Sequence, residues 1–309
     1  MTASDSILNF RRLEAFLAVV DTGSISRAAE LTEVAQSVVS RHVAALEKQL
    51  GCSLFERSNR GITLTPVAAR LAPRLRGAID EMQRASYEAA EIGNEPSGVV
   101  RVGVVPSAAH PLVGLLFQRM AAQYPRISLQ YVEGFTNPLE EMLADGRIDL
   151  AVVNRIGRKV RRGDERLCSF DTMVFGAPEA FESGQEVSFV QLAKRPLVLP
   201  ARPNALRAAL DIPSKKYGLQ LHVFVESDSL LIMKDLVLHA GLFTVLPKQA
   251  MHEELRSGRL SAARLVNPTM LRTLNLLSSV KRPSSAATRT VARELRGIVQ
   301  RDLIGKAWG

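Results

Sequence analysis

The chain has 309 residues, enough for two or three domains, and 46% of them are hydrophobic, which supports folded cores. It contains no uncharged apolar stretch of about 18 residues, and its start lacks the basic residues and apolar run of a secretory signal, so neither a membrane span nor export is expected. The net charge of +9 points towards nucleic acid, but residues 1–93 contain 11 basic and 11 acidic residues, so the surplus lies in the remainder of the chain.

The first 50 residues predict three short helices. The helix over residues 13–20 has one apolar face, formed by Leu13, Phe16, Leu17 and Val20. This face is expected to complete a small helical core with the next two helices.

Residues 24–47 predict two further helices joined by a tight turn. Ala28 and Ala29 in the first of them are small enough to let two helix backbones approach closely. The second helix has an apolar stripe at helical spacing, formed by Val39, Val43 and Leu46.

The opposite face of this last helix carries short hydrogen-bonding groups and one cation in its first two turns, namely Gln36, Ser37, Ser40 and Arg41. Such side chains read base edges when the N-terminus of a helix enters the major groove. These residues alone fit an ordinary amphipathic helix pair in an all-α core equally well. The segment that follows favours DNA binding.

Gly51 stands just past the end of this helix, at the usual position of a left-handed C-cap. Residues 53–65 then contain two short extended runs around a polar turn, which is typical of a hairpin. Three helices followed by a hairpin predict a winged helix.

Phosphate attraction in this region depends on single arginines, because the region as a whole has no net charge. Arg57 and Arg60 stand at the predicted tip of the hairpin, and Arg27 and Arg41 stand on the two preceding helices. We expect all four to contact the DNA backbone.

The same segment resembles the DNA-binding end of the LysR-type transcriptional regulators. The resemblance rests on Phe16, Ser24, Ala28-Ala29, Leu31, Gln36, Ser40, Leu46-Glu47, Leu50-Gly51, Leu54-Phe55, Arg57, Leu64-Thr65 and Pro66. The sequence departs from the family pattern at Ala35, where the family usually has Ser or Thr. If Ala35 is the N-cap of the recognition helix, a side-chain cap worth about 1 kcal/mol is missing.

Residues 65–93 predict one long helix, capped by Thr65 and with Pro66 at its first position. Apolar residues repeat along it at steps of three and four, as in a heptad seam: Ala68, Leu71, Leu75, Ala78, Met82, Ala85, Ala89 and Ile92. The seam fits either packing on the helix's own domain or pairing with a second copy. Pairing is favoured because a narrow seam buries well against another helix, and a two-fold dimer would present two recognition helices.

After the linker at residues 94–98, strands and helices alternate, which indicates a parallel sheet covered by helices. The periodicity predicts two α/β units. The family resemblance implies that they form a two-lobed, periplasmic-binding-protein-like effector domain, with the chain crossing between lobes near residues 155–162 and 267–271. The predicted organisation is therefore α/β, with a winged helix-turn-helix at 1–66, a linker or dimerisation helix and hinge at 67–98, and the effector domain at 99–309.

Ligands of open parallel sheets bind at the carboxyl ends of strands, beside helix N-termini. Ser107 and Thr136 follow two such strands and offer hydroxyls suited to a carboxylate or another anion. Four residues at strand ends of the other lobe complete the predicted effector site: Arg202, Asn204, Phe224 and Glu226. The alternative for Ser107, Thr136 and Asn204 is that they serve only as helix caps.

Catalytic and metal-binding signatures are missing from the sequence. The five histidines are scattered, and the two cysteines, Cys52 and Cys168, lie far apart without metal-ligand spacing. We expect no enzyme activity, no cofactor, no bound metal and no disulfide. The basic run at residues 155–166 is interpreted as a solvated loop at the hinge rather than a nucleic-acid tract, with a subunit contact as the second possibility.

These features predict a cytoplasmic, LysR-type transcriptional regulator. Its expected partners are double-stranded promoter DNA, a small-molecule effector for which an anion is the candidate class, further copies of itself as a homodimer or homotetramer, and RNA polymerase, with no membrane. Two alternatives stay open: a solute-binding or transport-linked protein whose N-terminal helices mediate assembly, and a nonspecific architectural DNA binder. The missing signal argues against the first, and the zero net charge of the N-terminal region argues against the second.

Overall fold

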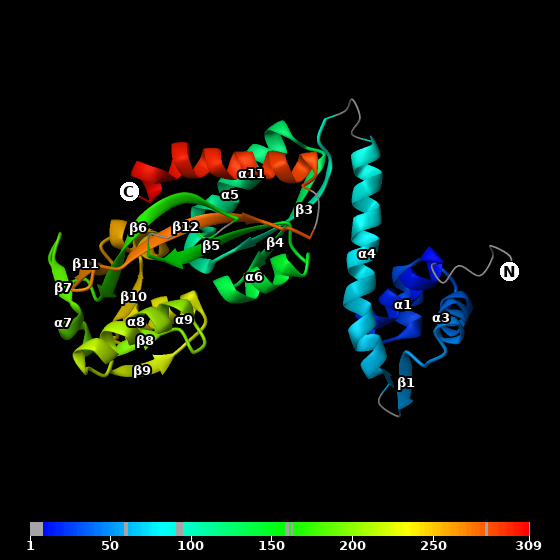
Figure 1. The fold of residues 1–309 in the computed structure, drawn as a ribbon, viewed down its shortest axis with the longest axis horizontal. Helices are drawn as coiled ribbons and strands as arrows, with labels where there is room; N and C mark the ends of the chain where they lie inside the picture. Colours follow the sequence, from blue (N-terminus) through cyan, green and yellow to red (C-terminus); the bar gives the residue numbers. More distant parts are fainter. Residues whose placement is uncertain are drawn as a thin grey trace. The chain divides into compact units, whose positions relative to one another are not determined.

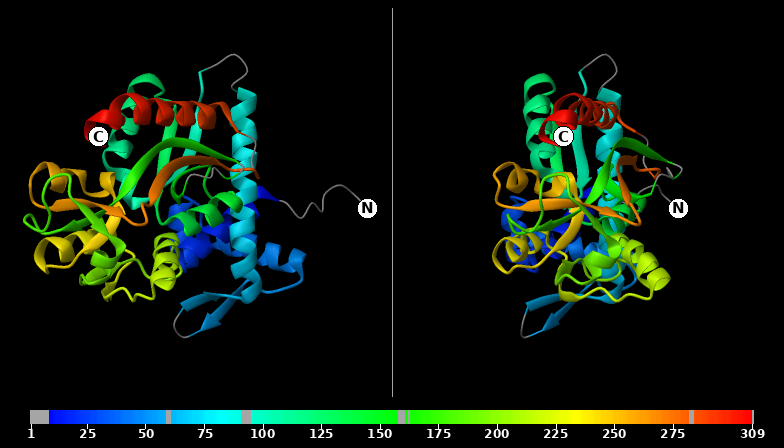
Figure 2. Two further views of the ribbon diagram at one scale, coloured as in Figure 1. Left: turned by 60° about the vertical axis from the view of Figure 1, so that its left-hand side comes forward. Right: turned by 90° about the vertical axis from the view of Figure 1, so that its left-hand side faces the viewer.

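The computed structural model describes residues 9–58, 61–90, 95–157, 161, 163–281 and 284–308. The chain divides into two compact units, Met1–Ser86 and Tyr87–Gly309. Figure 1 draws both units with their element labels, and Figure 2 gives two further views.

The N-terminal unit begins with the three predicted helices, α1 (Phe10–Thr22), α2 (Ile25–Leu31) and α3 (Gln36–Leu50). The predicted apolar faces form the core: Phe16, Ala28 and Val39 are fully buried, and Leu46 is 1% exposed. Gly51 ends α3 with a left-handed φ of 67°, and its N–H donates to the carbonyl of Glu47, as the sequence predicted.

The predicted hairpin is confirmed by strands β1 (Phe55–Ser58) and β2 (Gly61–Leu64), which pair antiparallel. The tip, including Arg60, lies outside the described residues. The hairpin is fixed to α3, because the Glu47 carboxylate accepts hydrogen bonds from the backbone N–H groups of Leu54 (2.7 Å) and Phe55 (3.3 Å). A partly buried, charge-assisted contact of this kind sets the position of the wing relative to the recognition helix.

Helix α4 (Pro66–Ala90) begins at the predicted proline, and the Thr65 hydroxyl accepts a hydrogen bond from Ala68 N (3.2 Å). The first half of α4 packs on its own domain, since the seam residues Ala68 (buried), Leu71 and Leu75 (partly buried) belong to the same core as α1, together with Ala72 and Ile79. Met82, farther along the seam, is 62% exposed. The first half of the seam therefore packs on its own domain. Pairing with a second copy stays a prediction for the second half.

The first lobe of the C-terminal unit is built on the parallel strands β3 (Gly98–Val104), β4 (Ile127–Glu133) and β5 (Leu150–Ile156), in the order β4-β3-β5. Figure 1 shows α6 (Thr136–Ala144) on one side of these strands, with α5 (Pro106–Gln123) and α11 (Ala286–Ile298) on the other. The π-helix η2 (Val299–Ala307) continues α11. These elements share one hydrophobic core.

Two long strands, β6 (Asp164–Gly176) and β12 (Leu271–Ser278), connect the lobes (Figure 2). Strand β12 lies antiparallel between β5 and β6, and the second half of β6 pairs with β10 (Thr244–Pro247) and β11 (Ser261–Val266) of the second lobe. The chain crosses twice between lobes, as the family resemblance implied.

The second lobe packs two hydrophobic clusters around the second half of β6. Besides β10 and β11, its elements are β7 (Glu186–Ser188), α7 (Phe189–Ala193), β8 (Leu197–Leu199), α8 (Ala205–Tyr217), β9 (Val223–Glu226), α9 (Leu230–His239), η1 (Lys248–Met251) and α10 (His252–Arg256). The predicted two-lobed α/β fold is confirmed. None of the helices in the described ranges is both long and apolar enough to cross a bilayer.

The basic run at residues 155–166 is not simply a solvated loop, and that interpretation was wrong at both ends of the run. Arg155 is the sixth residue of β5 and only 7% exposed, and Asp164 begins β6. Arg161, between them, is exposed. Arg155 can be buried within this basic run because it pairs with two carboxylates, Asp164 at the start of β6 and Glu140 on α6.

Candidate DNA-binding surface and effector cavity

The predicted recognition residues occupy the first two turns of α3. Gln36, Ser37 and Arg41 are exposed and Ser40 is half-buried, while Val39 and Val43 point into the core. The helix thus presents its polar N-terminal face to solvent, which is the face that a major groove requires.

Two further cations, Arg11 and Arg12, lie close enough to α3 to act on its His42. The pKa of His42 is lowered by its burial and by the charges of Arg41, Arg12 and Arg11. Arg11 and Arg12 lie in the first turn of α1 and were not among the predicted DNA contacts, because their chain position gives no sign that they approach α3. Arg27, on α2, is exposed as expected.

Ala35 is the N-cap of α3 and makes no side-chain cap, as the sequence indicated. By contrast, Asn9 caps α1 and Ser24 caps α2 through their side-chain oxygens. Ala35→Ser is therefore expected to raise the free energy of unfolding of the N-terminal unit by about 1 kcal/mol. Chemical denaturation of the full-length protein, followed by circular dichroism, measures this change.

The matched control is Ala44→Ser, on an exposed position in the interior of the same helix. Serine there has no cap to make and a lower helix propensity than alanine, so stability is expected to fall by a few tenths of a kcal/mol. Equal changes in the two variants would contradict the capping argument.

A cavity of about 360 Å³ lies between the two lobes of the C-terminal unit. Its walls come from the N-termini of α5 and α6, the ends of β5 and β12, and the loop before α8. Apolar side chains dominate the lining, among them Val105, Ile156, Leu206, Met233 and Leu246. This volume and composition fit a small ligand.

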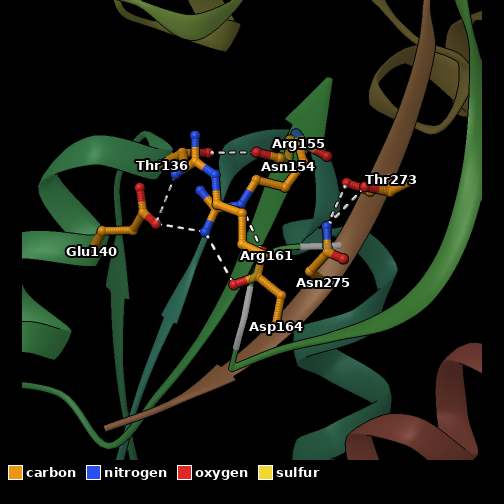
Figure 3. A network of polar contacts seen from close by, with 8 residues as sticks. All are labelled: Thr136, Glu140, Asn154, Arg155, Arg161, Asp164, Thr273 and Asn275. Atoms are coloured by element: carbon orange, nitrogen blue, oxygen red, sulfur yellow. Dashed lines mark hydrogen bonds and ion pairs between the residues drawn. The ribbon is translucent and has the colours of Figure 1, made fainter. Parts of the chain in front are cut away.

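Ser107 and Thr136 line this cavity and meet at one residue, Asn154 of β5. The Asn154 amide nitrogen donates to Ser107 Oγ (2.8 Å), and Thr136 Oγ1 donates to the Asn154 carbonyl oxygen (3.2 Å; Figure 3). Neither hydroxyl caps its helix, since the N-caps of α5 and α6 are Val105 and Phe135. The cap-only alternative therefore does not describe Ser107 or Thr136.

The residues predicted in the second lobe are placed differently. Asn204 lines the cavity but also caps α8, accepting a hydrogen bond from Leu206 N (2.8 Å). Arg202 and Phe224 do not line the cavity. Arg202 is exposed and pairs with Asp211, and Phe224 is 62% exposed.

Glu226 also lies outside the lining, because its carboxylate is held by the buried Arg207 of α8 (2.7 Å). The structure thus brings Ser107, Thr136 and Asn204 together around one cavity. Contact of these residues with an effector stays a prediction.

Sequence reasoning missed five polar residues of the cavity lining, namely Asn137, Glu141, Asn154, Asp228 and Arg272. Two of them, Asn154 and Arg272, belong to strands of the sheet. Asn154 lies on β5, opposite Leu274, and Arg272 lies on β12, opposite Ile156. The available signal was the position of Asn154 just past a predicted strand end. No comparable signal marks Arg272, since its place depends on the register of β12.

Two of the five histidines come together with a carboxylate away from this cavity. His110 stacks on His252 with ring centroids 5.4 Å apart, and its Nε2 lies 2.9 Å from Glu253 Oε1. The possible ligand atoms of the three residues lie within 4.8 Å of one another, so they could accept a metal ion. The chain order gave no hint of this grouping, because His110 is far from the other two in sequence.

Cys52 and Cys168 are free thiols. Burial raises the pKa of Cys168 to about 12, so this thiol is protonated at neutral pH. A protonated, half-buried thiol is a poor nucleophile and a poor peroxide sensor.

A winged helix with an exposed recognition face, followed by a two-lobed unit with a cavity between its lobes, defines a ligand-responsive DNA-binding regulator. Residues 10–69 match the family model described as bacterial regulatory helix-turn-helix protein, lysR family, and residues 93–299 match the LysR substrate binding domain. The chain belongs to the LysR family of transcriptional regulators.

Relatives match along nearly the whole chain. The nitrogen assimilation regulatory protein nac of Escherichia coli (strain K12) is 27% identical over 300 residues, covering 97% of this chain and 98% of that protein. A probable hydrogen peroxide-inducible genes activator of Mycobacterium leprae (strain TN) is 30% identical over 284 residues, covering 91% of each.

Among solved structures, full-length CbnR complexed with its target DNA has a TM-score of 0.71 at 17% identity, covering 94% of this chain and 99% of that one. Its likeness supports the fold. The curated relatives are regulators rather than transport proteins, so the solute-binding alternative is set aside.

Proposed function

We propose that this protein binds promoter DNA in a sequence-specific manner through α3 and responds to a small molecule held between the lobes of its C-terminal unit. The observation that carries the proposal is the exposed polar face at the N-terminus of α3, where Gln36, Ser37, Ser40 and Arg41 stand over a closed apolar core. Arg27, Arg57 and Arg60 supply backbone contacts.

The functional species is a homodimer or a dimer of dimers. Support comes from the second half of α4, where Met82 continues the apolar seam away from the core of its own domain. A two-fold axis along this seam would place two recognition helices on a site with matching symmetry. In this organisation residues 1–66 bind DNA, 67–98 link and dimerise, and 99–309 bind the effector.

Effector binding acts by shifting the population of interlobe arrangements, because the ligand touches side chains from both lobes and favours the arrangement in which all contacts are made. The change reaches the DNA through the oligomer and alters access of RNA polymerase in the cytoplasm. The protein acts as a switch and catalyses no reaction.

Genome-wide mapping of bound sites, followed by footprinting of one mapped promoter, tests DNA recognition. We expect protection of a limited, interrupted palindrome and much weaker binding to random duplex at the same salt concentration. Equal affinity for promoter and random fragments would leave only nonspecific architectural binding. The operon beside the mapped site also indicates the chemical class of the effector.

The double variant Ser107→Ala/Thr136→Val tests the cavity. It removes two hydroxyls that hold Asn154 at the cavity wall, so effector binding is expected to weaken by at least 10-fold, about 1.4 kcal/mol. Isothermal calorimetry with the effector suggested by the mapped operon measures the loss. Unchanged affinity in the double variant would remove these two residues from the site.

A further inference from the structure

Among the described residues of the C-terminal unit, three arginines are almost fully buried, namely Arg155, Arg207 and Arg272. Two of them have carboxylate partners. Arg155 is held by Asp164 and Glu140, and Arg207 is held by Glu226 and by the carbonyl oxygen of Pro200. A buried guanidinium is tolerated in this way, because the pairing offsets the loss of hydration.

Arg272 is the exception among the three. It is 5% exposed, and its Nε and Nη2 atoms are buried without a hydrogen-bond partner. Burial lowers its pKa to about 10, and no carboxylate in the described part of the chain offsets the effect, so the group still carries its charge at neutral pH. An uncompensated buried charge is costly and marks a site whose partner comes from outside the chain.

The position of Arg272 identifies where that partner sits. It lines the interlobe cavity, and the register of β12 places it opposite Ile156 of β5, which lines the same cavity. One polar atom of the neighbouring Asn154 amide is also buried without a partner. Two unsatisfied polar groups thus border one largely apolar space.

We propose that Arg272 is the anion receptor of the effector cavity and that the effector is a small organic carboxylate with an apolar body. This inference rests on the proposed function. A guanidinium binds a planar carboxylate through two parallel hydrogen bonds. The uncapped N-termini of α5 and α6 open on the same cavity and favour negative charge there. The apolar lining accommodates the body of the ligand.

A singly charged ligand fits the charge balance better than a phosphate. Among the cavity-lining residues that the structure describes, Arg272 is the one cation, and the lining also includes the carboxylates of Glu141 and Asp228. A doubly charged group would meet repulsion that one guanidinium does not offset. Inorganic phosphate therefore serves as a discriminating probe.

The first arm of the test needs no ligand. Thermal unfolding of the full-length protein is compared for wild type, Arg272→Met and Arg155→Met. Methionine preserves much of the side-chain volume, so Arg272→Met removes an unpaired charge and is expected to raise the midpoint by about 2–4 °C. Arg155→Met removes the cation that pairs with the carboxylates of Asp164 and Glu140, so it is expected to lower the unfolding midpoint clearly.

A midpoint of Arg272→Met at or above that of wild type supports the proposal. A midpoint below that of wild type overturns it, because the guanidinium would then be satisfied within the protein itself. The Arg155→Met variant shows that the assay detects the loss of a paired buried arginine.

The second arm uses matched ligands at millimolar concentration, namely hexanoate, benzoate and lactate, their primary amides, and inorganic phosphate. At least one carboxylate is expected to raise the wild-type midpoint by a few degrees, its amide should not, and Arg272→Met should lose the response. The assigned ligand class is overturned if no carboxylate acts, if an amide or phosphate acts equally well, or if the response persists in Arg272→Met. Footprinting of wild-type protein on its mapped promoter decides the proposed function separately.

Discussion

Replacing Arg155 by methionine is expected to lower the free energy of unfolding of the C-terminal unit by about 3–5 kcal/mol. Arg155 Nε donates to Asp164 Oδ2 (2.8 Å), and its Nη2 contacts both Asp164 and Glu140 (Figure 3). Burial opposes the charge on Arg155, but the two carboxylates outweigh burial and raise its pKa. Without the guanidinium, the Asp164 side chain, 4% exposed, is left as an unpaired buried charge.

The control for this variant is Arg161→Met, which removes a cation from the same network. Arg161 is 67% exposed and lies 3.7 Å from the Glu140 carboxylate, so its loss is expected to change stability by less than about 1 kcal/mol. Calorimetric unfolding of both variants at pH 7 makes the comparison. A similar small change in the two would mean that water replaces the Arg155 contacts.

Arg155 also bears on function through its place in the fold. It joins α6 of the first lobe to the start of β6, the strand that continues into the second lobe. Its neighbour Asn154 contacts Ser107 and Thr136 at the cavity wall. The ion pairs therefore hold the edge of the cavity at the point where the chain leaves the first lobe.

The elements of the N-terminal unit could be predicted from the sequence because the interactions that define them are local. Apolar spacing located α1, α2 and α3, and Gly51 and Pro66 marked helix ends that the structure confirms. The same patterns predicted the alternating elements of the C-terminal unit. Missing from that prediction were the short elements β7, α7 and β11, whose few residues carry too little periodicity.

The cavity was only partly predictable, since strand-end position identifies loops but not the contacts between them. Ser107, Thr136 and Asn204 were found by that rule and line the cavity. Arg202 and Glu226 satisfied the same rule, yet each has an internal partner, Asp211 and Arg207, that lies on α8.

Arg272 escaped the sequence analysis because its role depends on long-range pairing. Its strand returns from the far end of the chain to lie between β5 and β6. No local pattern reveals that register, and a single arginine before a predicted strand is ordinarily a surface residue.

Gln36→Ala is expected to reduce affinity for the promoter far more than affinity for random duplex. Gln36 is exposed at the first position of α3, where an amide can form a bidentate contact with an adenine. Each such contact is worth about 1–3 kcal/mol, and a dimer makes it twice, so the loss is about 2–6 kcal/mol, or roughly 30-fold to 10⁴-fold. Fluorescence anisotropy with both duplexes at one salt concentration measures it.

The matched control is Lys48→Ala, which removes an exposed cation from the last turn of the same helix. Because a recognition helix enters the groove with its N-terminus, losing Lys48 should change binding to the two duplexes by similar, small amounts. A reduced preference for promoter over random DNA in Gln36→Ala alone, at unchanged helix content, assigns base recognition to the start of α3. If Gln36→Ala instead weakens both duplexes equally, its side chain contacts the backbone, and sequence must be read by other residues of that face.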